Sequence, residues 1–197
     1  MAGTAAAFTG AAAFARSEYE RIHLDIVHYD IKTDKLGLEW NGFKAVFLSD
    51  LHDNSFGMEN EELLAAIEKE QPDIVVIGGD MLVVKEWAAP HFDMLANLYK
   101  KLVKRYPVYY AFGNHEQRMK EEPLTYPGWW QSYWKVLKDS GMHVLVNKSE
   151  EIIKNDTAMR ISGITLPREC YRKGRIPSLS AGYIDKKKDP LFELFPQ

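Results

Sequence analysis

Three short apolar runs in this chain each end in residues that a strand interior would not tolerate. The runs cover residues 44–48, 73–77 and 108–112, and their length and composition are typical of strands buried on both faces of a sheet. Helical patterns lie between them, at residues 61–67 and 91–105. Because strands alternate with helices, right-handed crossovers and a largely parallel sheet are expected. We therefore predict an α/β fold.

Weaker patterns extend this organisation on both sides. Alternating apolar and polar residues from 24 to 31 indicate a partly exposed strand at a sheet edge. Residues 129–138 form a further helical pattern, and residues 144–146 and 160–166 indicate two more strands. The aromatic residues of that helix have helical spacing, so we expect them to pack onto the sheet rather than to form a lipid- or base-stacking surface. They are Trp129, Trp130, Tyr133 and Trp134.

Composition limits the ligands that the chain can bind. Apolar residues make up 46% and aromatic residues 12% of its 197 residues, which fits one globular domain. With 25 basic and 28 acidic residues the formal charge is −3, so we expect no basic patch for nucleic acid. The single cysteine, Cys170, permits neither an internal disulfide nor a thiolate metal cluster. Any metal ion must therefore be held by imidazole, carboxylate and amide groups.

The amino terminus differs in composition from the rest of the chain. Residues 1–15 carry no charge and are mostly alanine. They are fewer than the roughly 20 residues needed to span a bilayer, and they lack the basic start of a secretory signal. A clipped membrane anchor or export signal and a merely Ala-rich tail are both consistent with them. We divide the chain into this segment with its linker, residues 1–22, and a domain over residues 23–197. If the segment is an anchor or export signal, membrane association or export is favoured over a cytoplasmic location.

Polar side chains follow the carboxyl ends of the three predicted strands. In a parallel sheet these ends open into one crevice, so residues distant in sequence can meet there around a ligand. Gly79 directly precedes Asp80 and Gly113 directly precedes Asn114. These glycines allow the chain to turn sharply. We expect these residues to converge: Asp50 and His52 after the first strand, Asp80 after the second, and Asn114 and His115 after the third.

These residue types suit manganese, iron, zinc or magnesium better than copper. A carboxylate can bridge two ions, and two cations about 4 Å apart can activate a water and neutralise the charge that builds on phosphoryl oxygens. An unligated histidine nearby can protonate the leaving oxygen. Taken singly, each aspartate could equally be a turn or helix cap, and Asn114 a turn residue.

Three motifs in order, Asp50-x-His52, Gly79-Asp80 and Gly113-Asn114-His115-Glu116, resemble the first three motifs of the calcineurin-like metallophosphoesterases. The resemblance implies an α-β-β-α sandwich and two divalent metal ions. It also implies that Asp50 and His52 bind the first ion, Asp80 bridges, Asn114 binds the second, and His115 acts as acid. Glu116 matches the motif without an assigned role. The region around the first motif resembles a bacterial branch whose members often begin with a membrane or export segment.

The family completes its site with a further histidine and a Gly-His-x-His motif, and neither follows Asn114-His115 in this sequence. His143 precedes its predicted strand, so we expect it to lie away from the crevice. We interpret the chain as a fragment or a shortened product, incomplete at the carboxyl end of the sandwich. We accordingly expect weak metal binding, and hydrolysis of phosphoesters that is poor or absent.

For the complete protein, the family resemblance implies hydrolysis of a phosphoester. The substrate could be a phosphomonoester, a phosphodiester or the pyrophosphate of a nucleotide-lipid. The sequence does not distinguish among these substrates. One alternative is a non-catalytic metal-binding or interaction domain that keeps the fold. A Rossmann-like nucleotide-binding module is disfavoured because no G-x-G-x-x-G motif follows the first strand.

Overall fold

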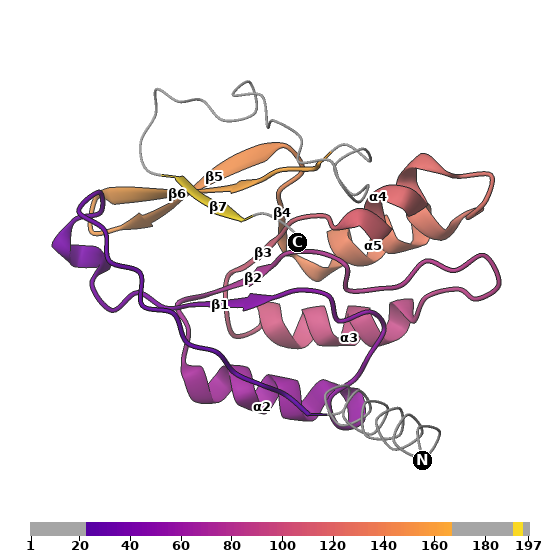
Figure 1. Ribbon diagram of the computed structural model, residues 1–197, viewed down its shortest axis with the longest axis horizontal. Coiled ribbons are helices and arrows are strands. Elements are labelled where there is room, and N and C mark those ends of the chain that lie inside the picture. Colours follow the sequence, from indigo (N-terminus) through magenta and orange to yellow (C-terminus); the bar gives the residue numbers. More distant parts are fainter. Residues whose placement is uncertain (1–22, 167–190, 195–197) are drawn as a thin grey trace, which may run out of the picture.

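The computed structural model describes residues 23–166 and 191–194, which form two packed sheets (Figure 1). The first sheet has four parallel strands in chain order. In the second, the central strand pairs antiparallel with one neighbour and parallel with the other. The first sheet contains β1 (Ala45–Leu48), β2 (Ile74–Ile77), β3 (Val108–Tyr110) and β4 (His143–Val144), and the second contains β5 (Lys148–Lys154), β6 (Thr157–Gly163) and β7 (Leu191–Leu194).

Helices cover one face of the first sheet, and the second sheet lies over its other face (Figure 1). The α-helices are α2 (Glu61–Glu70), α3 (Phe92–Val103), α4 (Asn114–Glu121) and α5 (Trp129–Ser140), with short 3-10 helices η1 (Leu38–Trp40) and η2 (Met58–Asn60). The predicted α/β class with a parallel sheet is therefore confirmed. Cys170 and the segment 1–22 lie outside the described residues. Within residues 23–166 and 191–194, no helix is both long and apolar enough to cross a bilayer.

Strand β2 shows why the two layers pack as they do. All four of its residues are buried, and successive side chains of a strand point to opposite faces. Val75 and Ile77 join the core beneath the helices, whereas Ile74 and Val76 join a second core with Ile161 of β6. The apolar run of β2 is thus explained by burial on both faces. The same prediction is wrong for β1, because this strand lies at the sheet edge and its Ala45 and Phe47 are exposed.

Helix α5 packs its aromatic face as expected. Tyr133 is fully buried, and Trp130 and Trp134 meet Phe112 edge to face, with ring centroids 5.4 and 6.3 Å apart. Such aromatic pairs add to the stabilisation from area burial. The expectation that these residues serve packing is confirmed.

The predicted strand at residues 24–31 is wrong, because this segment is neither helix nor strand. Val27, Tyr29 and Ile31 are exposed. A strand needs a neighbour to satisfy its backbone groups, and within the described residues this segment pairs with none. Alternation indicates which side chains share a face but does not provide a partner strand.

Two strand predictions near the carboxyl end were misplaced. The strand predicted at residues 144–146 is β4, which ends at Val144, after which Leu145 turns into the second core. The strand predicted at residues 160–166 is β6, which begins at Thr157 as half of a hairpin with β5. The two-residue turn Asn155-Asp156, with both φ values positive, connects them. Strand β5 escaped prediction because four of its seven residues are charged: Lys148, Glu150, Glu151 and Lys154.

Candidate metal centre

The loops after β1 and β2 run side by side beyond the strands. The amides of Asp50, His52 and Asp53 donate to the carbonyls of Gly79, Asp80 and Met81 respectively, each at 3.1 Å. The φ angles of Asp50, His52, Asp53 and Asp80 lie between +50° and +58°. This left-handed backbone costs an L-residue about 1 kcal/mol, and such strain clusters at functional sites.

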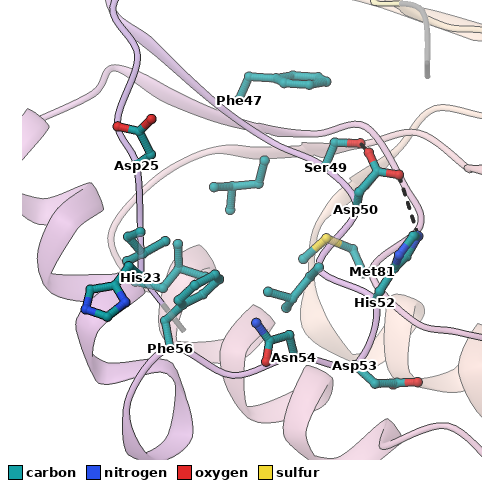
Figure 2. Close-up of a pocket in the computed structure, with 14 residues that line it drawn as sticks. His23, Asp25, Phe47, Ser49, Asp50, His52, Asp53, Asn54, Phe56 and Met81 are labelled. Carbon is teal, nitrogen blue, oxygen red and sulfur yellow. Dashed lines mark hydrogen bonds and ion pairs between the residues drawn. The ribbon is translucent and has the colours of Figure 1, made fainter. Parts of the chain in front are cut away.

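Asp50, His52 and Asp80 form a group suited to a cation. One ligand atom from each lies within 4.8 Å of the others, and Nε2 of His52 is 3.6 Å from Oδ1 of Asp50. Figure 2 shows Asp50 and His52 facing each other, with the Ser49 hydroxyl donating to the Asp50 carboxylate. Asp80 is only 4% exposed, whereas the side chains of Asp50 and His52 are nearly half exposed. Two carboxylates and an imidazole fit a hard or borderline divalent ion.

Asn114 and His115 reach the same group from the start of α4. The side-chain amide of Asn114 donates to Oδ2 of Asp80 at 2.7 Å, and the backbone amide of His115 donates to Oδ1 of Asp80 at 2.7 Å. The donated bond leaves the carbonyl oxygen of Asn114 as its acceptor for a cation. The structure thus brings all five predicted residues together around Asp80, while their roles as ligands and acid stay predictions.

The ring of His115 lies against His52, with the two ring centroids 5.3 Å apart. Its Nδ1 accepts a hydrogen bond from the backbone amide of Val84 at 3.1 Å. Because Nδ1 accepts, the proton of the neutral ring is on Nε2. Partial burial lowers the pKa of His115, and the nearby charge of Asp80 opposes this effect.

Glu116 has a role that sequence analysis did not assign. Its carboxylate is fully buried and accepts four hydrogen bonds: from the amides of Gly113 and Asp80 at 3.0 Å each, the amide of Met81 at 3.2 Å, and the hydroxyl of Tyr110 at 2.7 Å. It therefore joins the loops after β2 and β3. Burial raises the pKa of Glu116 to about 7, as does the charge of Asp80, against the pull of its hydrogen bonds. The sequence signal was a glutamate three residues after a helix cap.

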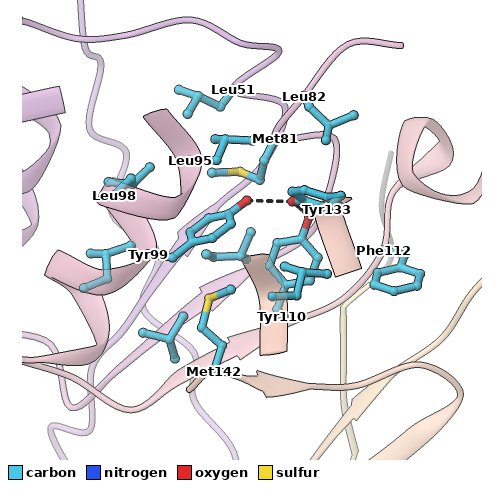
Figure 3. Close-up of a cluster of buried hydrophobic side chains, with 14 of the residues drawn as sticks. Leu51, Met81, Leu82, Leu95, Leu98, Tyr99, Tyr110, Phe112, Tyr133 and Met142 are labelled. Atoms are coloured by element: carbon cyan, nitrogen blue, oxygen red, sulfur yellow. Dashed lines mark hydrogen bonds between the residues drawn. The ribbon is translucent and has the colours of Figure 1, made fainter. Parts of the chain in front are cut away.

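A chain of tyrosine hydroxyls continues from Glu116 into the core. The Tyr133 hydroxyl lies 2.6 Å from that of Tyr110 and 2.7 Å from that of Tyr99 (Figure 3). All three side chains are fully buried, and the network gives each hydroxyl a partner. Burial also raises the pKa of Tyr110, to which the Glu116 charge adds. The core beneath the site thus contains a line of buried tyrosine hydroxyls that is surrounded by apolar side chains.

Two glycines allow the loops to approach closely. Gly79 has a φ of +94°, and a Cβ there would collide with the backbone of Gly113. A Cβ on Gly113 would meet the carboxylate and amide of Asp80. The glycines were predicted to permit sharp turns, and the structure adds that they let Asp80 lie against α4.

His143 lies apart from this group. It begins β4, stacks on Tyr109 with ring centroids 4.7 Å apart, and contacts Glu150 through Nδ1 at 2.6 Å. This amino-terminal position agrees with its predicted exclusion from the crevice. A cavity of about 660 Å³ does adjoin the site, and its walls include Asp50, His52, Leu24, Phe47 and Phe56 (Figure 2).

Comparison with known proteins agrees with this geometry. Residues 43–191 match the calcineurin-like phosphoesterase family. An uncharacterized metallophosphoesterase of Bacillus subtilis (strain 168), YkoQ, is 32% identical over 117 residues. That alignment covers 59% of this chain and 41% of the relative, so the chain spans about two fifths of the relative's length. Since the family match covers most of the chain and includes every predicted site residue, the chain belongs to the calcineurin-like phosphoesterases.

Proposed function

We propose that this chain forms the metal-binding part of a phosphoesterase that hydrolyses phosphoester bonds with divalent metal ions. The observation that carries the proposal is the convergence of Asp50, His52 and Asp80 within 4.8 Å at adjacent strand ends. Water adds to phosphorus, the bond from phosphorus to the alcohol oxygen breaks, and that oxygen takes up a proton.

The proposal includes two ions. Asp50 and His52 would hold the first, Asn114 the second, and Asp80 would bridge, because its carboxylate lies between the two sets. The oxygen and nitrogen donors suit manganese, iron, zinc or magnesium. When bound, such ions supply polarisation of the phosphoryl oxygens and activation of a water.

His115 is the proposed catalytic residue. Its Nδ1 is occupied by the Val84 amide, so Nε2 is the nitrogen that donates to the oxygen of the leaving alcohol. The benefit of such donation grows with the basicity of the leaving alcohol. A phosphodiester with an alkyl leaving group should therefore depend on His115 more strongly than one with a nitrophenol leaving group.

The cavity beside Asp50 and His52 supports a substrate whose alcohol carries apolar atoms, because Leu24, Phe47 and Phe56 line it. A nucleotide-lipid is one such substrate, and it suits a membrane-associated or exported form. In that form residues 1–22 would act as an anchor or signal.

The test measures metal binding and turnover together. Manganese is titrated into the purified chain by calorimetry, and release of nitrophenol from bis(4-nitrophenyl) phosphate is followed. Asp80→Asn should abolish both signals, since it removes the shared carboxylate charge. Asp73→Asn is the control, because Asp73 binds the Lys44 amide at the start of β1, far along the sheet from the site. Metal binding without turnover would support the non-catalytic alternative. Wild-type signals that are weak but above those of Asp80→Asn agree with the expected weak binding, whereas manganese binding no stronger than in Asp80→Asn would refute the proposal.

A further inference from the structure

Asp53 directly follows the candidate ligand His52 but does not belong to the metal-binding group. Figure 2 shows its carboxylate directed away from Asp50 and His52. Instead, Oδ2 accepts from the amide of Val83 at 2.9 Å and Oδ1 accepts from the amide of His91 at 3.2 Å. One carboxylate therefore holds both ends of the segment from residue 83 to residue 91, which leads from β2 to α3.

The bond to Val83 has a consequence for the neighbouring peptide. The next amide, that of Val84, is the donor to Nδ1 of His115 at 3.1 Å. The Val83 and Val84 amides belong to two rigid peptide planes that are joined at the Val83 Cα by only two dihedral angles, so fixing the Val83 amide restricts where the Val84 amide can point. Asp53 is in turn fixed by its own amide, which donates to the Met81 carbonyl at 3.1 Å.

We propose that Asp53 is a positioning residue for His115, acting through the Val83-Val84 backbone to hold the imidazole ring with Nε2 as its donating nitrogen. The inference rests on the proposed function, in which His115 donates to the leaving oxygen. Without Asp53 the segment 83–91 loses a charged acceptor at each end, and hydrogen bonds to charged groups are the stronger ones. The His115 ring then loses the donor that orients it.

The first test needs neither metal nor substrate. Amide hydrogen exchange of Val84 is measured by NMR in the wild type, Asp53→Ala and Asp53→Asn. We expect exchange at Val84 to accelerate about 10-fold or more in Asp53→Ala, because local opening becomes easier, and the Nδ1 resonance of His115 to lose its hydrogen-bonded shift. The asparagine variant, which keeps one acceptor oxygen, should fall between the two and serves if the alanine variant does not fold.

Asp73→Ala is the matched control, since it also removes an aspartate that accepts a backbone amide, from Lys44 at 2.7 Å, at the opposite strand ends. It should leave Val84 exchange unchanged. Unchanged Val84 exchange in Asp53→Ala, or equal acceleration in the Asp73 control, would overturn the proposal.

The second test uses turnover and a double-mutant cycle. With manganese, Asp53→Ala should lower kcat about 10-fold, as removal of an orienting partner commonly does, with a larger loss for alkyl than for nitrophenol leaving groups. In the His115→Ala background the same change should have no further effect, because its action passes through the missing ring. Additive losses would overturn the proposal. A chain that binds manganese but turns over no substrate would support the non-catalytic alternative to the proposed function, while the exchange experiment would still decide the role of Asp53.

Discussion

Replacing Glu116 with glutamine should destabilise the fold although the two side chains have nearly the same shape. The glutamate accepts from four donors, two on each oxygen. Glutamine presents an NH₂ group in place of one oxygen, so two buried donors lose their acceptor and face another donor. Each unsatisfied buried donor costs about 1–3 kcal/mol. For two lost bonds, we therefore expect the free energy of unfolding to fall by about 2–6 kcal/mol.

Urea denaturation followed by circular dichroism measures this change, at a pH above the Glu116 pKa of about 7, where the carboxylate is ionised. Glu59→Gln is the control. Like Glu116, Glu59 accepts hydrogen bonds, from Asn97 and Lys101, but its side chain is exposed. It should change stability by less than about 0.5 kcal/mol. A Glu116→Gln variant as stable as the control would refute the reasoning, since it would show that the ionised carboxylate is not what satisfies the strand-end amides.

Two further expectations follow from the structure, and a third follows from the composition of the amino terminus. Gly79→Ala should cost about 3 kcal/mol or more in urea denaturation and weaken manganese binding, because its Cβ meets the Gly113 backbone. Gly128→Ala, at a φ of +78° with open space around it, should cost only about 1 kcal/mol, and equal losses would contradict the steric argument. Tyr133→Phe should lower the free energy of unfolding by about 1–2 kcal/mol, since it removes a hydroxyl with two buried partners. Deleting residues 1–15 should leave the melting temperature nearly unchanged in a thermal scan, whereas a large fall would show that they pack into the core.

Sequence determined the parts of this protein that depend on local pattern. The apolar runs became β1, β2 and β3, and the polar residues after them were predicted to converge because parallel strands end at one edge. Asp50, His52 and Asp80 do meet there. The spacing of apolar side chains and the direction of a strand are local properties of a chain, so the convergence could be inferred from the sequence alone.

The pairing of strands could not be predicted from local sequence pattern. Residues 24–31 alternate as a strand does, yet within the described part of the chain they pair with no neighbour. The hairpin of β5 and β6 formed where only one strand was expected, because its turn at Asn155-Asp156 and its cross-strand pairing stabilise a strand whose charged sequence shows no strand pattern. Whether a segment becomes a strand depends on a second segment, and periodicity describes only the first.

Only the tertiary structure decided how the site is held in place. Glu116 accepts from Asp80 across 36 residues, Val84 donates to His115 across 31, and Asp53 accepts from His91 across 38. None of these partners is marked by spacing in the sequence. A buried polar group must find a partner wherever the fold brings one, and that choice depends on how loops from different strands pack. The sequence therefore identified the residues that can do chemistry, whereas the fold determined which others orient them.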